Sequence, residues 1–200
     1  MFKFSKEQIV FDIGGVKVGG AIGENPTAMI GSIFYKGDKT VKDERSGDFD
    51  QEAAKRLIVK AEEMSKKTGL PAMLDVICTN SNSAEKYIRF AAEITEMPLL
   101  IDSVSDEAAV KGLETARDLG IMERTILNSI SPETRDSIYK KIREVGLKNA
   151  VLLTYSARAI ISSKERVKLL ETLLPKVKEA GIEKILIDTV VVDISTCLLY

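Results

Sequence analysis

Short apolar runs alternate with longer segments of helical period along most of this chain, from residue 27 onward. The clearest helical segment, "DQEAAKRLIVKAEEMSKKTG", keeps its apolar residues on one face. Asp50 is a candidate N-cap at its start, and Gly69 is a candidate stop at its end. The pattern therefore predicts a helix over residues 50–69.

Six apolar runs predict strands, and a helical segment follows each of the first five. The runs are, in chain order, "TAMIGSIFY", "AMLDVI", "LLID", "TILN", "AVLLT" and "KILID". A polar loop over 36–48 separates the first run from its helix. The later helices should begin near Ser83, Asp106, Pro132 and Ser163. The cap signals are Asn82 with Glu85, Ser131 before Pro132 and Ser162 with Glu165, and the stops are Gly120, Gly146 and Gly181.

Strands that are apolar on both faces and separated by helices predict a parallel sheet with right-handed crossovers. The residues at five strand ends, Asp75, Asp102, Asn128, Thr154 and Asp188, are 27, 26, 26 and 34 residues apart. Such near-constant units favour a (β/α)8 barrel, although spacing alone leaves a doubly wound sheet open. A full barrel needs eight strands. We therefore predict an α/β TIM-type barrel truncated after about six strands, as one domain over 27–200. Its open edge would expose unpaired backbone groups, so we expect a homo-oligomer.

The first 26 residues form a separate segment in this interpretation. "QIVFDIGGVKVGG" predicts a hairpin of two short strands joined at Gly14 and Gly15, placed as a plug in the N-terminal mouth of the barrel. The glycines also invite comparison with a phosphate-binding loop. No Gly-Lys-Ser/Thr follows them and the GxGxxG spacing is missing, so the hairpin is favoured over nucleotide binding.

Composition narrows the chemistry. The 200 residues are 44% hydrophobic and 30% charged, with a net charge of -1, which fits a globular protein with no electrostatic footprint for nucleic acid. No histidine is present, and this excludes Ser-His-Asp and Cys-His pairs and the HExxH zinc site.

No apolar run reaches the roughly 18 to 20 residues that span a bilayer, and the start lacks the core of a signal peptide. We expect a cytoplasmic chain whose two cysteines, Cys78 and Cys197, are packing residues rather than a disulfide.

Polar residues at the strand ends are the candidate functional site. In a parallel barrel, Asp75, Asp102, Asn128 and Asp188 would meet at one mouth, although each could instead cap a nearby turn. Several carboxylates and an amide, without histidine or clustered basic residues, suit a neutral heterocycle rich in N–H donors. A carboxylate can accept two parallel hydrogen bonds from the amino and ring N–H edge of a pterin. Metal binding is the weaker alternative, because no calcium-loop spacing is present.

Three segments carry a resemblance to a known family. "GGVKVGGAIGENPTAMIGSIFY", "LLIDS" and "ILNSIS" resemble the H subunit of tetrahydromethanopterin S-methyltransferase, over Met1 to about Asp193. More distantly, "LIDS" and "NSIS" are similar to the pterin-binding barrels of methyltetrahydrofolate corrinoid-protein methyltransferases and of methionine synthase. Two features depart from these families: Ala21-Ile22 stand where a Gln-Pro is common, and the further asparagine of a later strand is not found in this sequence.

The resemblance implies a methyltransferase that moves a methyl group from N5 of methyl-tetrahydromethanopterin to a cob(I)amide on a separate corrinoid subunit. It implies that Asp102 anchors the pterin, that Asn128 lies near N5 as the catalytic residue and that Asp188 also binds the ring. Asp75, Ser103 and Ser129 complete the implied substrate-binding set, and no metal is implied. Two alternatives stay open: an incomplete, non-catalytic pterin-binding or scaffold subunit, and a relative that uses methyl-tetrahydrofolate. Any membrane association would come through partners.

Overall fold

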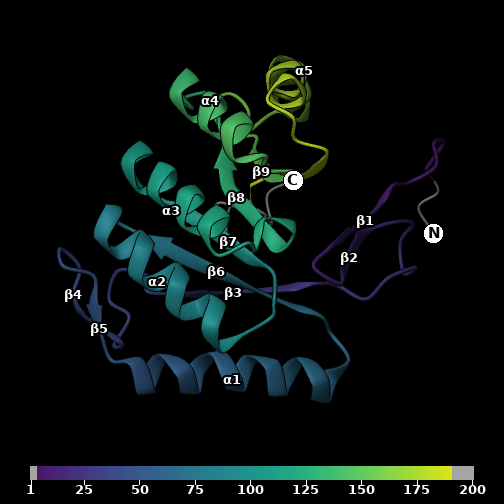
Figure 1. The fold of residues 1–200 in the computed structure, drawn as a ribbon. Helices are drawn as coiled ribbons and strands as arrows, with labels where there is room; N and C mark the ends of the chain where they lie inside the picture. Colours follow the sequence, from purple (N-terminus) through teal and green to yellow (C-terminus); the bar gives the residue numbers. More distant parts are fainter. Residues whose placement is uncertain (1–3, 191–200) are drawn as a thin grey trace.

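Six parallel strands form the main sheet of the computed structural model, which describes residues 4–190. Their order across the sheet is β10-β9-β8-β7-β6-β3, so neighbours in the chain are neighbours in space. Figure 1 shows the sheet curled into a half-barrel with helices along its outer side. The strands are β3 (Met29–Ile33), β6 (Ala72–Cys78), β7 (Leu99–Ser103), β8 (Thr125–Ile130), β9 (Asn149–Leu153) and β10 (Lys184–Asp188). The predicted α/β fold and all six predicted strands are confirmed.

The helices alternate with these strands, as predicted. They are α1 (Gln51–Thr68), α2 (Ser81–Ile94), α3 (Asp106–Asp118), the short 3-10 helix η1 (Met122–Arg124), α4 (Asp136–Val145) and α5 (Ser163–Glu179). The limits of α1 follow the prediction, because the Asp50 side chain accepts a hydrogen bond from the amide of Ala53 and Gly69 ends the helix at φ +71°. The predicted N-cap Ser162 of α5 is also confirmed.

Two helix starts differ from the prediction. α2 is capped by Asn80 rather than Asn82, because Asn80 and Ser83 exchange side-chain and backbone hydrogen bonds in a capping box. α4 begins four residues after Pro132. Ser131 and Thr134 close a turn of their own there, with the Thr134 hydroxyl accepting from the amide of Ser131, and this local pairing competes with a helix. Both shifts move helix ends only and leave the strand order unchanged.

The sheet has two different faces. Its outer face packs on the helices through residues such as Val76, Ile101 and Leu127. Its inner face contributes Met73, Leu100, Ile126 and Val151 to a smaller apolar cluster. Because successive side chains of a strand point to opposite faces, the residue two positions after each inner-face residue also points inward.

The N-terminal hairpin covers one end of the inner face. β1 (Val10–Ile13) and β2 (Val16–Gly19) pair antiparallel, and Ile13 and Val16 insert into the inner cluster near the beginnings of β6, β7 and β8. The Lys184 Nζ also donates to the carbonyl oxygen of Asp12 at 2.6 Å. The predicted hairpin plug is confirmed. A second small hairpin, β4 (Val41–Asp43) with β5 (Asp48–Phe49), lies inside the segment that was expected to be a polar loop.

The turn of the plug gives a stability prediction. Gly14 has φ +54°, and a Cβ added there would lie 2.6 Å from the Cβ of Arg124. Gly15 has φ +84° and open space around it. Gly15→Ala should therefore cost only the backbone strain, about 1 kcal/mol, whereas Gly14→Ala adds an overpacking cost of about 1–3 kcal/mol. Urea unfolding of both variants measures the difference, and equal losses would contradict the plug contact.

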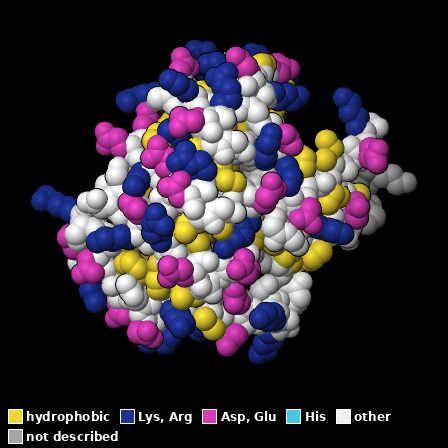
Figure 2. Space-filling model, viewed as in Figure 1, with side chains coloured by type: hydrophobic (Ala, Val, Ile, Leu, Met, Phe, Trp, Pro, Cys, Tyr) yellow, Lys and Arg dark blue, Asp and Glu magenta, His cyan; other side chains and the backbone are white. Residues whose placement is uncertain are grey.

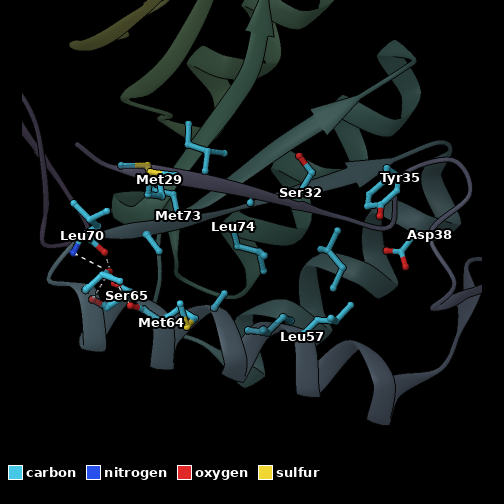
Figure 3. Close-up of a pocket in the computed structure, with 17 residues that line it drawn as sticks. Met29, Ser32, Tyr35, Asp38, Leu57, Met64, Ser65, Leu70, Met73 and Leu74 are labelled. Atoms are coloured by element: carbon cyan, nitrogen blue, oxygen red, sulfur yellow. Dashed lines mark hydrogen bonds between the residues drawn. The ribbon is translucent and has the colours of Figure 1, made fainter. Parts of the chain in front are cut away.

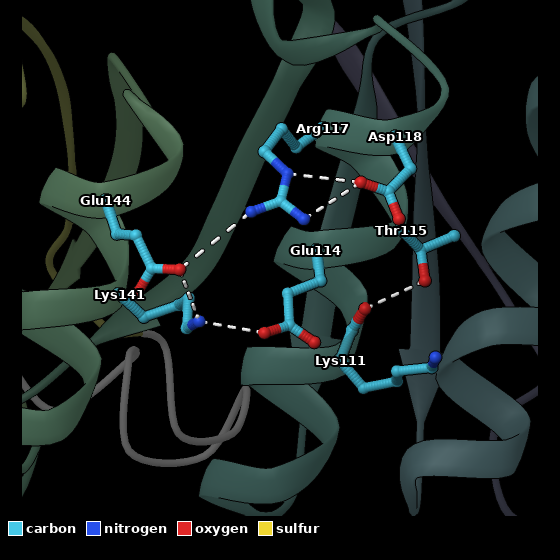
Figure 4. Close-up of polar contacts among 7 residues, drawn as sticks. All are labelled: Lys111, Glu114, Thr115, Arg117, Asp118, Lys141 and Glu144. Carbon is cyan, nitrogen blue, oxygen red and sulfur yellow. Dashed lines mark hydrogen bonds and ion pairs between the residues drawn. The ribbon is translucent and has the colours of Figure 1, made fainter.

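Ion pairs join neighbouring βα units on the outer side. The Lys141 Nζ of α4 lies 2.8 Å from a carboxylate oxygen of Glu114 on α3 and 3.0 Å from Glu144, as Figure 4 shows. Over the face seen in Figure 2, acidic and basic side chains are interspersed without a large patch of one sign. The pair of Lys141 with Glu114 joins α4 to α3, next to the strands that carry the candidate site, whereas the pair with Glu144 lies within α4.

Candidate functional site

Three of the polar residues predicted from the strand ends lie on the inner face of adjacent strands. Asp75, Asp102 and Asn128 each follow by two positions an inner-cluster residue of β6, β7 and β8. Asp102 and Asn128 are direct register partners. The side chains therefore lie along one face, just beyond the apolar cluster that the hairpin covers.

A short chain of hydrogen bonds crosses this face. The Asn128 Nδ2 donates to Oδ1 of Asp75 at 3.2 Å. The hydroxyl of Ser32, on β3, donates to Oδ2 of the same carboxylate at 2.8 Å. Asp75, which is 5% exposed, thus accepts from both sides. Side chains of three strands are joined in one unit.

The electrostatics differ between the two aspartates. Burial raises the pKa of Asp75, while its hydrogen bonds from Asn128 and Ser32 act in the opposite direction. Burial, with a smaller contribution from the charge of Asp75, raises the pKa of Asp102 to about 6. Within residues 4–190 no hydrogen-bond donor of the protein contacts the Asp102 carboxylate. It is a half-buried acceptor that can take a ligand's N–H groups.

Asp188 lies on the same face but apart from this unit. It ends β10, two positions after the inner-face residue Leu186, and β9 separates it from β8. Its side chain is exposed, and its Oδ1 accepts from the amide of Val190 at 2.7 Å. Asp188 is therefore at the far side of the half-barrel opening, without a described contact to Asp75 or Asn128.

The two predicted serines face a different space. Ser103 follows an inward residue by one position, so alternation turns it away from the inner face. Both line a cavity of about 200 Å³ between the loops that follow β7 and β8, together with outer-face residues such as Leu127 and Ile138. The structure thus brings Asp75, Asp102 and Asn128 together and places Ser103 and Ser129 beside them, on the other side of the sheet.

Ser32 is the contact that sequence reasoning did not identify. It is a lone hydroxyl within the apolar run "TAMIGSIFY", and its register partner is Asp75. The only signal in the sequence was a polar residue inside an apolar run. Its partner becomes evident only from the pairing of β3 with β6.

A larger cavity meets this site only at Ser32, which is among its lining residues. It has about 530 Å³ and runs between β3 and α1, as Figure 3 shows, with an apolar lining that includes Met29, Leu57 and Met64. Among the described strands, β3 pairs only with β6, so this groove follows an open edge of the sheet. It carries none of the inner-face carboxylates Asp75, Asp102 and Asp188.

Other features limit the chemistry of the described residues. Among residues 4–190 no group of three or more acidic or cysteine side chains is arranged to hold a metal ion. The thiol of Cys78 is buried, as expected for a packing residue, and burial raises its pKa so that it stays protonated. Cys197 lies outside the described residues. None of the helices in this part of the chain is long and apolar enough to cross a bilayer.

The comparisons with known proteins point to one family. Residues 6–198 match the family model described as tetrahydromethanopterin S-methyltransferase MtrH subunit. The H subunit of that enzyme from Methanothermobacter marburgensis is 39% identical over 78% of this chain and 50% of its own length. The Methanopyrus kandleri protein of the same name is 38% identical over 92% of this chain and 60% of its own length.

A further relative has a different name. It is the H subunit of a putative methyltransferase, mtx, from Methanosarcina mazei, and it is 36% identical over 86% of this chain and 55% of its own length. The chain thus spans between half and two thirds of the length of these curated relatives. Since the family model covers nearly the whole chain, the resemblance inferred from the sequence is confirmed: this chain belongs to the MtrH family, the H subunits of tetrahydromethanopterin S-methyltransferase.

Proposed function

We propose that this chain binds methyl-tetrahydromethanopterin at the inner face of its half-barrel and passes the N5 methyl group to the cob(I)amide of a corrinoid protein. The observation that carries the proposal is the Asp102 carboxylate, half-buried and without a protein donor among residues 4–190, beside Asn128 on the same face. Membership in the MtrH family supports the identity of the substrate.

The proposed binding mode uses the polar groups of that face. Asp102 accepts two parallel hydrogen bonds from the amino and ring N–H edge of the pterin. Asn128, its register partner, then lies toward N5. Asp188, across the opening, is the proposed second ring contact. Ser103 and Ser129 are proposed to support the neighbouring loops, since their side chains line the adjoining cavity.

The proposed reaction needs a better leaving group than a neutral amine. When the N5–methyl bond breaks, its electron pair stays on N5, which holds a proton, while the electron pair of Co(I) forms the new carbon bond and cobalt becomes Co(III). A cationic N5 lowers the barrier, and groups that stabilise it in the transition state raise the rate. Asn128 accepts or donates, and the proton comes from water or the carboxylates. The chain itself needs no nucleophile, which fits a sequence without histidine.

Calorimetric titration with methyl-tetrahydromethanopterin tests the binding step. We expect saturable binding by the chain, and unchanged binding in Asp43→Asn, a control whose carboxylate lies in the exposed β4–β5 turn. Addition of cob(I)alamin should then yield methylcobalamin. Absence of binding would overturn the proposal.

The same titration separates the alternatives. Binding without transfer would favour a pterin-binding scaffold subunit, a candidate that the chain's partial coverage of its relatives supports. Tighter binding of methyl-tetrahydrofolate would favour the folate-using alternative.

The proposed partners follow from the reaction and the open sheet. A corrinoid-carrying subunit docks over the inner face, where the methyl group is exposed. A Co(I) nucleophile and the buried Cys78 thiol fit a reducing, cytoplasmic compartment, with any membrane contact made through partners. Self-association through the open β3 edge is also proposed, and sedimentation velocity over a range of concentrations measures it.

A further inference from the structure

We propose that Asp75 is a positioning residue rather than a pterin ligand. With Ser32 it fixes the carboxamide of Asn128 so that Oδ1, and not Nδ2, faces the substrate. The catalytic role inferred for this orientation rests on the proposed function. The orientation of the Asn128 amide itself can be tested in the protein without any ligand.

Both oxygens of Asp75 already have partners inside the protein. Oδ1 accepts from Asn128 Nδ2 at 3.2 Å, and Oδ2 accepts from Ser32 at 2.8 Å. The residue is 5% exposed and lies opposite Leu100 in the register, whereas Asp102 lies opposite Asn128 and is accessible. Asp75 is thus placed deeper along the strands than Asp102. The accessible acceptor of the pair is Asp102.

The orientation of Asn128 follows from what an ionised carboxylate can do. It only accepts hydrogen bonds, so the amide must turn its NH2 group toward Asp75. A flipped amide would set a carbonyl oxygen against a carboxylate oxygen in a buried site, with both acceptors unpaired, which is costly. Burial raises the pKa of Asp75, and the hydrogen bonds from Asn128 and from the Ser32 hydroxyl, which holds the other carboxylate oxygen, act against that rise and favour the ionised form. Ser32 therefore supports the orientation from the far side.

The fixed amide has a chemical consequence. With its Nδ2 committed to Asp75, Asn128 offers its carbonyl oxygen to the opening of the half-barrel. A carbonyl oxygen accepts a hydrogen bond from a protonated N5 and gives none to the neutral amine. The arrangement therefore favours the cationic leaving group. Because the carbonyl is oriented before the substrate binds, no reorganisation is needed when the charge develops on N5.

Asp75→Asn and Ser32→Ala test the orientation without any ligand. In nitrogen-edited NMR spectra of the free chain, one Asn128 side-chain NH proton should be shifted downfield and exchange slowly, as expected for a donor to a buried carboxylate. Asp75→Asn, which lets the amide pair either way, should remove this signature. Ser32→Ala should weaken it and Ser32→Thr, which keeps the hydroxyl, should restore it. An unchanged Asn128 signal in Asp75→Asn would overturn the proposal.

Kinetics separate a positioning residue from a ligand. Asp75→Asn should change the Kd for methyl-tetrahydromethanopterin by less than about threefold and slow transfer to cob(I)alamin by about tenfold, the size expected for one misplaced hydrogen bond. Asp43→Asn is the control and should change neither. A loss of affinity as large as that of Asp102→Asn would make Asp75 a ligand and overturn the proposal. If the parent chain binds no pterin, the proposed function fails, while the NMR result still decides the orientation.

Discussion

Replacing Asn128 with alanine should slow methyl transfer by about a hundredfold or more, the usual effect of losing one preorganised hydrogen-bonding group at a developing charge. The Kd for the methylated pterin should change by less than about tenfold, because the bond to N5 strengthens mainly when N5 becomes cationic. Single-turnover reaction with cob(I)alamin measures the rate, and calorimetry measures the Kd.

The variant also removes a donor from Asp75, so its fold must be checked. Asn128 lies on the inner face, and the outer-face core does not include it. We therefore expect the variant to fold, with a loss of stability of about 1–3 kcal/mol because Oδ1 of the buried Asp75 loses its donor. Asn25→Ala, at the hairpin end of the strands, is the matched control, because its amide contacts only the Gly19 carbonyl oxygen among the described residues. Equal losses of affinity and rate in Asn128→Ala would make Asn128 a binding residue only.

The sheet could be predicted from the sequence because its central strands, β6 to β9, are largely buried, while the more exposed edge strands β3 and β10 still stand out as apolar runs. Each strand is a short apolar run, and the intervening helices force neighbouring strands to run in the same direction. That direction places Asp102 and Asn128 side by side near the ends of β7 and β8. Asp75 lies in the middle of β6 rather than at its predicted end, but it is on the same face, two register positions before Asp102. The convergence of these three residues was therefore predictable from pattern alone.

The side of the sheet on which each residue lies needed a further step. Ser103 follows Asp102 by one residue, so alternation already turned it to the other face. For Ser129 the alternation is interrupted by an irregularity between Leu127 and Ile130, and its place is given by the cavity that it lines with Ser103. Ser32 could not be assigned in this way. Its contact with Asp75 depends on the register between β3 and β6, which no single strand encodes.

Local hydrogen bonding accounts for the misplaced start of α4. Ser131 and Pro132 form a good helix-start pattern, but the side chains of Ser131 and Thr134 satisfy the turn by themselves. Helix propensity correctly predicts a helix in this region. Its first residue is set by the competition between the helix and the turn closed by Ser131 and Thr134.

Asp102→Asn should weaken binding of methyl-tetrahydromethanopterin by about tenfold to a hundredfold, since a charged acceptor bond to a buried ligand is worth about 1.5–3 kcal/mol. An amide of the same shape offers one acceptor and one donor to two N–H groups. Affinity in the parent should also fall as pH drops below about 6, because protonation of Asp102, whose pKa is raised to about 6, removes the same acceptor. Calorimetric titrations at pH 5 and pH 8 measure both effects.

Asp102→Asn should raise the stability of the folded chain, although it weakens pterin binding. Burial raises the pKa of Asp102 from its usual 3.8 to about 6, so the folded chain holds this proton more tightly than the unfolded chain. The contribution of the protonated Asp102 to the free energy of unfolding is therefore fully present below pH 4, and it is lost as the pH rises to about 6 and above. An asparagine is neutral at every pH, so the variant does not lose this contribution. After allowance for solvent screening, the variant should be more stable than the parent by about 1 kcal/mol at pH 8, and equal to it near pH 4. Thermal unfolding at the two pH values measures this, with a rise of about 2–4 °C expected at pH 8.

Weaker binding together with higher stability is the signature of a carboxylate held in place for a ligand. A variant that binds like the parent, or that is less stable at pH 8, would show that Asp102 serves the fold instead.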